Sequence, residues 1–490
     1  MKQIIKFSTK IAVVFLALMG LFITSCQKEL LDPIPLTSYS DASVFTSPER
    51  IQQQVNGIYA ALKNGQFYGG RFVVYHEIRG ENYLNETTNG VTGFQTWNHT
   101  IVSSTNEVAT LWGAAYTTIN RVNVFLEGLE ANKGVVGNND LVNNYLGEAR
   151  FVRAVTYFSL LSLYARPFAD GNGNNLGVPL RLLSEKSGAN NDLARATVAQ
   201  VYALILEDLN FAEQNLPANY STAFNNTTRA HRNTAIAFKT RVLLHMGRYT
   251  DVIVEANKIV TPSAPFQASS GVPHALQANI ANVFKTPYTT TESIFSMPFT
   301  ENNLPGTQNG LGSYFNPGPR GIGDYSINLN GLVADPAWGT GDARRQFIVV
   351  NAANNKPYMN KFPTGPQHLD YLPIIRYSEV LLNLAEAIAR TSGTDERAIA
   401  LLNAVRGRSD DSVQFSQANF ASANDLVEVI LKERQIELLG EGFRSLDLMR
   451  LLRPLPAKAN VPAIEPARSE YIWPIPDSEL AVNKLIVQNP

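Results

Sequence analysis

The stretch Lys432–Arg450, KERQIELLGEGFRSLDLMR, constrains the fold most, because it combines an amphipathic helix with a regular pattern of charge. Asp425 followed by Glu428 predicts a capping box where this helix begins. Gly440 and Gly442 allow the helix to end. Apolar residues at helical spacing predict a face that packs inward: Leu426, Val429, Ile430, Ile436 and Leu439.

Three carboxylates recur at every fourth residue of this helix, at Glu433, Glu437 and Glu441. This spacing places them on one stripe. A catalytic or metal-binding stripe is one interpretation, but no His or Cys lies nearby to complete a metal site. We therefore favour buried pairing with arginines that end an earlier helix, such as Arg406 and Arg408. Beyond the glycines, Arg444, Asp447 and Arg450 recur at every third residue.

The composition indicates a chain with a large core and argues against a nucleic-acid-binding or disulfide-stabilised protein. The chain has 490 residues, 44% hydrophobic and 17% charged, which is enough for a large core. A formal net charge of −1 gives no reason to expect nucleic acid as a partner. The single cysteine excludes an intrachain disulfide.

The N-terminus predicts export and lipidation. A basic start precedes the apolar run Ile11–Ile23, which is short for a membrane span and suits a signal peptide over residues 1–25. The run ends in Ile-Thr-Ser-Cys, the pattern of a bacterial lipobox, so Cys26 is the predicted lipid anchor. Residues 26–38 then predict an extended linker, since Pro33 and Pro35 lie within it.

Helical patterns follow over most of the chain, and several of them form pairs. The predicted helices are Ser47–Lys63, Glu107–Glu130, Leu141–Tyr164, Thr197–Asn215 (with Thr197 and Gln200 as a capping box), Arg229–Gly247, Tyr249–Val260, Arg376–Arg390 and Asp395–Arg406. Arg229–Gly247 and Tyr249–Val260 form one pair, and Arg376–Arg390 and Asp395–Arg406 form another. Both pairs resemble tetratricopeptide repeats. We predict a mostly α fold in which such helix pairs form a scaffold.

Residues 261–371 break the helical pattern with dense glycine and proline. Their aromatic residues argue against disorder, so this segment is predicted to be an irregular, loop-rich lobe inserted between helix pairs, within a single domain over 39–490. An earlier loop, Pro167–Ala196, carries Asp170, Asn172 and Asn174 but lacks the glycine and glutamate of a calcium-binding EF-hand loop.

The chemistry-bearing motifs of common enzymes are missing from the sequence. The six histidines are scattered, and no nucleophile elbow, P-loop or dinucleotide-binding glycine motif occurs. We predict no catalytic residue, no cofactor and no metal. Acid pairs are abundant in a chain of this length, so a glycoside hydrolase stays open as the least favoured alternative.

Six segments in order resemble the SusD/RagB family, the nutrient-binding outer-membrane lipoproteins of Bacteroidetes. They are LWGAAYTTINRVN from Leu111, GEARFVRAVTYFSLLSLYARPFAD from Gly147, Ala235–Ile259, RYSEVLLNLAEA from Arg376, LLNAVRGRS from Leu401 and YIWPIP from Tyr471, besides Lys432–Arg450. The resemblance implies a lipid-anchored outer-membrane protein facing the cell exterior. It also implies that the chain captures an oligosaccharide and delivers it to a TonB-dependent transporter of the SusC type.

Sugars present flat C–H faces to aromatic rings and hydroxyls to amides and carboxylates. The early loops and the lobe offer this mixture, and the predicted ligand-binding residues are Glu81, Asn82, Trp97, Asn98, Tyr314, Arg320 and Trp338. By resemblance, Trp97 lies where the family often has a binding tryptophan. Trp112 and Trp473 are predicted to be structural. A binder of peptides or other nutrients, or a pure scaffold, remains an alternative because a fold does not fix its ligand.

Overall fold

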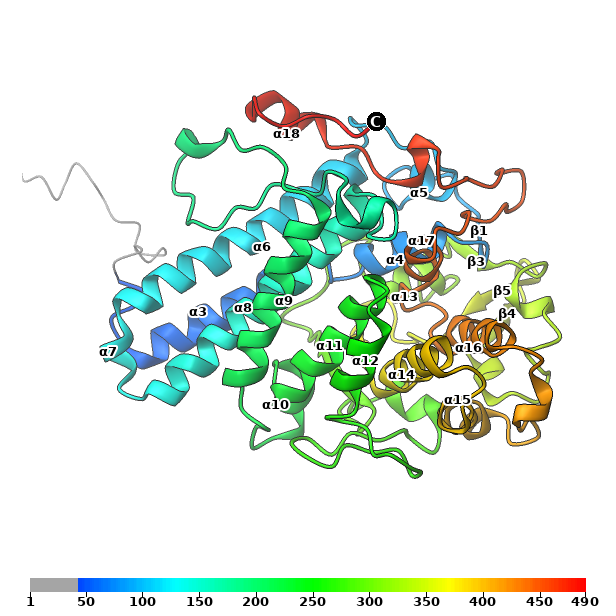
Figure 1. The fold of residues 1–490 in the computed structure, drawn as a ribbon. Helices are drawn as coiled ribbons and strands as arrows, with labels where there is room; N and C mark the ends of the chain where they lie inside the picture. Colours follow the sequence, from blue (N-terminus) through cyan, green and yellow to red (C-terminus); the bar gives the residue numbers. More distant parts are fainter. Residues whose placement is uncertain (1–42) are drawn as a thin grey trace, which may run out of the picture.

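The computed structural model describes residues 43–490, and its first half is a series of long helices packed side by side. Helix α3 (Pro48–Leu62) begins at Ser47, whose side chain accepts a hydrogen bond from the Arg50 amide. It packs on α6 (Asn106–Ala131) and α8 (Asn139–Tyr164), and α8 packs on α9 (Val198–Asn215) (Figure 1). The predicted signal peptide (1–25), the predicted lipidation site Cys26 and the predicted linker (26–38) lie outside the described residues.

Two helix pairs farther along the described chain continue the series. Helices α11 (Arg232–His245) and α12 (Tyr249–Ala256) form one pair, and α14 (Tyr377–Ser392) and α15 (Glu396–Ser409) form the other. Helix α12 packs on α14, which also contacts α16 (Ala423–Glu437). In Figure 1, α12, α14 and α16 follow one another across the lower half of the molecule. The predicted mostly α, tetratricopeptide-like scaffold is confirmed.

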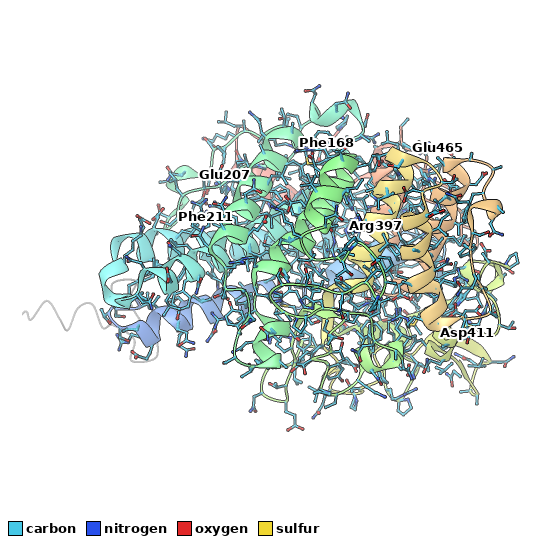
Figure 2. The ribbon with its side chains drawn as sticks, turned by 60° about the horizontal axis from the view of Figure 1, so that its bottom comes forward. Phe168, Glu207, Phe211, Arg397, Asp411 and Glu465 are labelled. Carbon is cyan, nitrogen blue, oxygen red and sulfur yellow. The ribbon has the colours of Figure 1, made fainter. Side chains whose placement is uncertain are left out.

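Shorter helices connect and cover these long ones. They are α4 (Arg71–Ile78), α5 (Phe94–Trp97), α7 (Lys133–Val136), α10 (Ala223–Thr228), α13 (Leu311–Phe315), α17 (Arg444–Arg450) and α18 (Asp477–Val482). Helix α18 lies at the opposite edge of the molecule from α10 (Figure 1). Side chains fill the spaces between the ribbons in Figure 2. On the outer side of α9, the Arg150 guanidinium lies 4.2 Å from the centre of the Phe211 ring, which is labelled there.

Within residues 43–490, the strands form three short antiparallel pairs rather than one sheet. Strand β1 (Tyr83–Asn85) pairs with β3 (Tyr325–Ile327), β2 (Ser293–Met297) with β6 (Leu372–Arg376), and β4 (Ile348–Asn351) with β5 (Lys356–Met359). All except β1 lie between α12 and α14, in the predicted loop-rich segment. Because β1 comes from the early loops, the β1–β3 pair joins those loops to the lobe.

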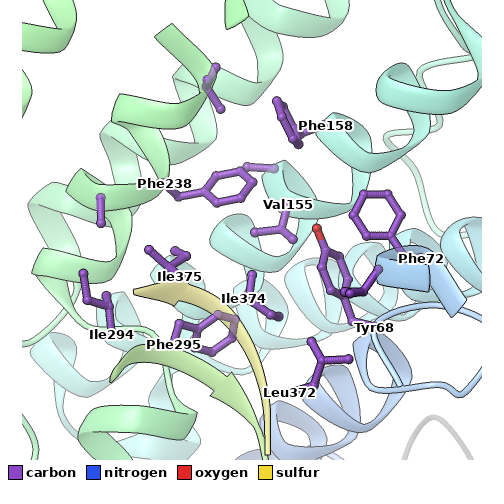
Figure 3. Packing of buried hydrophobic residues seen from close by; sticks show 14 of the residues in the cluster. Tyr68, Phe72, Val155, Phe158, Phe238, Ile294, Phe295, Leu372, Ile374 and Ile375 are labelled. Atoms are coloured by element: carbon purple, nitrogen blue, oxygen red, sulfur yellow. The ribbon is translucent and has the colours of Figure 1, made fainter. Parts of the chain in front are cut away.

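The core lies where α8, α11 and the β2–β6 pair meet (Figure 3). The rings of Phe158 and Phe238 meet edge to face with their centres 5.4 Å apart, and those of Phe151 and Phe295 do so at 5.3 Å. Edge-to-face pairs add to the stability that burial of the rings already provides. The lobe is therefore attached to the helical scaffold through a shared hydrophobic core.

Helix caps were predicted with mixed success. Thr197 and Gln200 form the expected capping box of α9. The predicted box of Asp425 and Glu428 is wrong, because Ser422 is the N-cap of α16 and its hydroxyl accepts from the Asp425 amide at 3.2 Å. Ser422 is itself a favoured capping residue, so the helix begins earlier than predicted.

The acidic stripe of α16 pairs with arginines, as predicted. Arg406 Nη2 lies 2.5 Å from Glu433 Oε2, and Arg408 Nη2 lies 2.6 Å from Glu437 Oε1. Glu441, just past the helix, is also buried and is bound by Arg376 and Lys361. Arg376 also binds Glu437 and Glu292, and three further members complete the network from other parts of the chain: Arg344, Asp342 and Glu292. The network fixes the lobe and α15 against α16, because Glu433, Glu437 and Glu292 each bind side chains from more than one of these elements.

Candidate functional site

The early loops and the lobe meet at the β1–β3 pair, where Tyr83 lies opposite Ile327. The loop after β1 stays against β3, since Tyr325 Oη donates to the Thr92 carbonyl at 3.0 Å. Thr87 Oγ1 also donates to the Asp324 carboxylate. We call residues 81–93 together with 322–330 the β1–β3 region. It brings two of the sequence segments predicted to bind ligand into one surface.

Glu81 and Asn82 lie at the start of this region, and side chains of α16 and α17 donate hydrogen bonds to them. The Glu81 carboxylate accepts from Arg444 at 2.6 and 2.9 Å and from Gln435 at 2.9 Å. Burial raises the pKa of Glu81, but the charge of Arg444 and the hydrogen bonds to the carboxylate, among them those from Arg444 and Gln435, together lower it further, so the net pKa is lowered and the group is ionised. Asn82 is buried, and its Nδ2 has no partner among the described residues.

Trp97 is 6% exposed, so it lies beneath this surface. Its Nε1 donates to the Tyr83 carbonyl at 2.9 Å, and Phe94 stacks at a centre-to-centre distance of 6.2 Å. Lys458 Nζ lies 5.6 Å from the indole centre. The neighbouring Asn98 is partly exposed, and its Oδ1 accepts from Thr100.

The lobe residues lie in three different places. Tyr314 is fully buried, donates to the Gln308 carbonyl at 2.7 Å and stacks on Tyr325 under the β1–β3 region. Trp338 is also buried and lies under the Arg345 guanidinium, 4.6 Å from the ring centre. Arg320 is partly exposed, on the loop that packs against Gly365.

The structure thus groups Glu81, Asn82, Trp97 and Tyr314 around the β1–β3 pair, whereas Arg320 and Trp338 make no ring contact or hydrogen bond with them among residues 43–490. The rings of Trp97, Tyr314 and Trp338 present no free face, because neighbouring loops and side chains cover them. A ligand would reach these rings only after those neighbours moved. Their role as ligand contacts stays a prediction.

A cavity of about 280 Å³ lies beside Thr96 and His99, on either side of Trp97 in the sequence. Its walls come from the end of α4, from residues 96–103 and from residues 469–490, and they include Arg79, His99, Val102, Glu470 and Trp473. Trp473 is 2% exposed, which confirms the prediction that it is a structural residue. Arg79 and His99 could not be predicted to line this cavity, because nothing in their local pattern shows that the end of the chain folds over them.

A second cavity, of about 680 Å³, lies between α6, residues 181–191 and α18. Trp112 lies in its wall, 3% exposed, which confirms the prediction that it is a core residue. Its polar lining is used within the protein: Arg181 binds both Glu185 and Glu479, and Asn120 binds the backbone of Glu185. These interactions pair Arg181, Glu185 and Glu479 with one another.

Within residues 43–490, no three His, Cys, Asp or Glu side chains are grouped so that they could hold a metal ion. In the calcium-like loop, the Asp170 carboxylate accepts from Arg166 Nε at 2.5 Å. No helix in this part of the chain is both long and apolar enough to cross a membrane.

Two family models match the chain. Residues 31–244 match a model described as "Starch-binding associating with outer membrane", and residues 346–490 match the model of the SusD family. SusD-like protein P2 of Formosa agariphila is 24% identical over 513 residues, which cover 94% of this chain and 95% of that protein.

Solved structures agree with the family models. A SusD superfamily protein from Bacteroides fragilis is 33% identical, with a TM-score of 0.81 over 90% of this chain and 99% of that one. Surface glycan-binding protein A from Bacteroides thetaiotaomicron, solved in complex with laminarihexaose, is 20% identical with a TM-score of 0.72 over 91% of this chain and 100% of that one, a likeness of fold. The chain belongs to the SusD family.

Proposed function

We propose that this protein binds an oligosaccharide at the cell surface and delivers it, chemically unchanged, to a TonB-dependent transporter of the SusC type. The observation that carries the proposal is the β1–β3 pair, which joins the early loops to the lobe in a protein of the SusD family. Surface glycan-binding protein A of B. thetaiotaomicron, which has the same fold, was solved in complex with laminarihexaose, and this supports a sugar as the ligand.

The proposed contacts are the predicted residues, in two sets. Glu81, Asn98 and Arg320 have accessible atoms and would bind hydroxyl groups directly. The buried members, Asn82, Trp97, Tyr314 and Trp338, would act by positioning the loops, or by direct contact if those loops open. Glu81 is suited to accept from sugar hydroxyls because it is ionised and fixed by Arg444.

The proposed mechanism is equilibrium binding followed by release into the transporter. Delivery requires release, so moderate affinity serves this function better than very tight binding. The protein would be held in the outer membrane by the acyl chains on Cys26, with the described residues outside the bilayer. Buried methylenes contribute about 0.8 kcal/mol each, so several chains together anchor a protein stably.

A pair of surface variants tests the position of the site. Val91 is 46% exposed in the β1–β3 region, and Val254 is 56% exposed on α12, part of the helical scaffold. We expect Val91→Arg to abolish binding to the hits of a glycan array, because a long charged side chain would occupy the surface. Val254→Arg should leave binding unchanged. Equal binding by both variants would move the site away from the β1–β3 region.

The transporter is tested separately. The full chain, expressed in its native membrane with an affinity tag, should copurify with an outer-membrane protein of the TonB-dependent class. Recovery of the chain alone, under conditions that preserve other outer-membrane complexes, would contradict the proposed partnership. Glycan binding is tested by the array and does not depend on this result.

A further inference from the structure

Phe224 is the only exposed aromatic residue among residues 43–490. It is 48% exposed on α10, whereas every other aromatic residue of this part of the chain is buried or partly buried. A single exposed apolar side chain is common on protein surfaces and needs no function of its own. Phe224 differs from such a residue because it lines a cleft whose other open groups are polar.

The cleft lies between α3, α10 and residues 297–303, and its volume is about 350 Å³. This volume is at the small end of the range for ligand sites. The residues of α3 that line it recur at helical spacing and form one stripe: Gln52, Asn56, Tyr59 and Lys63. Figure 1 shows α3 and α10 on the left of the molecule and the β1–β3 pair on the right, so the cleft is separate from the β1–β3 region.

Helix α10 holds the backbone of Phe224 in place from both ends. Before the helix, the Asn226 side chain accepts from the Tyr220 amide at 2.6 Å and donates to its carbonyl at 3.2 Å. After the helix, Arg229 donates to the Glu148 carboxylate at 2.5 and 2.9 Å. A backbone that is already ordered reduces the entropy that a ligand must overcome when it binds against the ring.

The open polar groups of the cleft are amides. Gln52, Asn56 and Asn303 are exposed, and Asn225 is partly exposed. The side chains of Gln52, Asn225 and Asn303 make no hydrogen bond with residues 43–490. Asn56 uses only its Nδ2, which donates to Gln53 at 3.3 Å. Because an amide side chain both donates and accepts, these groups are able to bind hydroxyls in either sense.

The charged groups of the lining already have partners within the protein. Arg229 forms the ion pair with Glu148. Lys63 Nζ donates to the Pro298 carbonyl at 2.8 Å and lies 5.2 Å from the centre of the Phe299 ring. No carboxylate of the described residues lines the cleft. The cleft thus offers mainly neutral hydrogen-bonding groups beside an apolar ring.

We propose that this cleft is a second carbohydrate site, in which one unit of a neutral saccharide stacks on Phe224 while its hydroxyls bind the amides of Gln52, Asn56 and Asn303. A sugar has a flat C–H face for a ring and hydroxyls that both donate and accept, which is the mixture found here. Trp97, Tyr314 and Trp338 are buried, so Phe224 is the aromatic residue that a sugar reaches without a movement of loops. The site gives a long glycan a second point of attachment.

This inference does not rest on the β1–β3 region. One ring and a few amides bind weakly, with a dissociation constant on the order of millimolar, which is too weak to retain a glycan on a washed array. Loss of array binding in Val91→Arg therefore tests the β1–β3 region and leaves this cleft intact. The cleft is tested in solution, at high sugar concentration, in the Val91→Arg protein.

The first experiment measures saturation-transfer NMR of four neutral disaccharides with the full chain carrying Val91→Arg. The probes are maltose, cellobiose, laminaribiose and lactose, which differ in linkage and in the orientation of one hydroxyl. We expect saturable binding of at least one probe, with a dissociation constant on the order of millimolar. Absence of saturable binding for all four at concentrations up to about 20 mM would overturn the proposal.

Variants of Phe224 separate stacking from apolar contact. In the same protein, Phe224→Leu should weaken binding about threefold or more, because leucine is apolar but has no aromatic face, whereas Phe224→Trp should retain it. Val254 is 56% exposed on α12, and Val254→Ala is the control that should leave binding unchanged. Equal affinities for Phe224→Leu and the parent protein would overturn the proposal.

Two glutamines of α3 provide a matched pair for the amides. Gln52 lines the cleft, whereas Gln54 lines a different cavity, between α3 and α6. Gln52→Leu should weaken binding about threefold, the effect of one hydrogen bond, and Gln54→Leu should leave it unchanged. A Gln52→Leu protein that bound the sugar as tightly as Gln54→Leu would overturn the proposal.

Discussion

Arg408 and Glu437 form a buried ion pair between α15 and α16, with 2.6 Å between Nη2 and Oε1. Glu437 also contacts Arg376 and Arg344, at 2.9 and 3.0 Å. Burial raises the pKa of Glu437, but Arg408, Arg376 and Arg344 together lower it far more, so it stays ionised. The Glu437 carboxylate thus binds three arginines that come from separate segments of the chain.

We predict that Glu437→Gln lowers the free energy of unfolding by about 3–5 kcal/mol, the usual cost of removing one partner from a buried pair. Denaturant melts measure this. Glu428→Gln is the matched control on the same helix, because Glu428 pairs with Arg453 on the surface and should contribute less than about 1 kcal/mol. Similar losses in both variants would refute the difference between buried and exposed pairs. Lost ligand binding in a stable Glu437→Gln would identify the stripe as functional.

The buried carboxyl of Glu77 predicts a dependence of stability on pH. Burial raises the pKa of Glu77 to about 7, although the amides of Gly442 and Phe443 donate to its Oε1. A raised pKa means that the folded protein holds a proton that the unfolded chain has released. This contribution is complete below about pH 4.5 and is lost as the pH rises through about 7.

We therefore expect the wild type to lose more stability than Glu77→Gln between pH 5 and pH 8, by up to about 3 kcal/mol. Glu107, whose pKa burial also raises to about 7, is present in both proteins and cancels in the comparison. Urea melts at the two pH values provide the measurement. Parallel pH profiles for the two proteins would show that Glu77 does not bind this proton.

Trp97→Ala should lower the free energy of unfolding by about 3–5 kcal/mol, as for other large buried rings. The reason is the cavity it leaves and the Tyr83 carbonyl that loses its donor. Ligand affinity per folded molecule, measured on the same samples, distinguishes a role of Trp97 in packing from a role in ligand binding. A variant with an unchanged melt and no binding would show that the ring contacts the ligand directly.

Cys26→Ala should remove the lipid and leave the fold intact, because the described core begins well after it. Incorporation of labelled palmitate into the wild type and the variant is the measurement. Continued labelling of Cys26→Ala would show that another residue carries the acyl chain.

Local patterns were enough to predict much of the scaffold. The helical spacing of apolar residues placed α6, α8, α11, α12, α14 and α15 nearly at their bounds. The partners Arg406 and Arg408 of the acidic stripe were predictable because they lie fewer than forty residues away and end a helix. Arg344 and Arg376 were not, since the lobe brings them to α16 by tertiary packing.

The site was harder to predict, because burial of a loop aromatic depends on distant segments. Trp97 lies in a polar stretch that suggests exposure, yet its N–H bonds to β1 and its ring lies near Lys458. Tyr314 is covered through the pairing of β1 with β3, more than two hundred residues apart in sequence. Residue type and spacing identified the region that carries these residues, but not which of its side chains face solvent.

We propose above that the protein binds an oligosaccharide and releases it chemically unchanged. Incubation of the full chain with each glycan-array hit, followed by calorimetry and by mass spectrometry of the recovered sugar, tests this most directly. We predict saturable binding of moderate affinity and a sugar of unaltered mass. Absence of binding across neutral and acidic oligosaccharides, or recovery of shortened sugar, would contradict it.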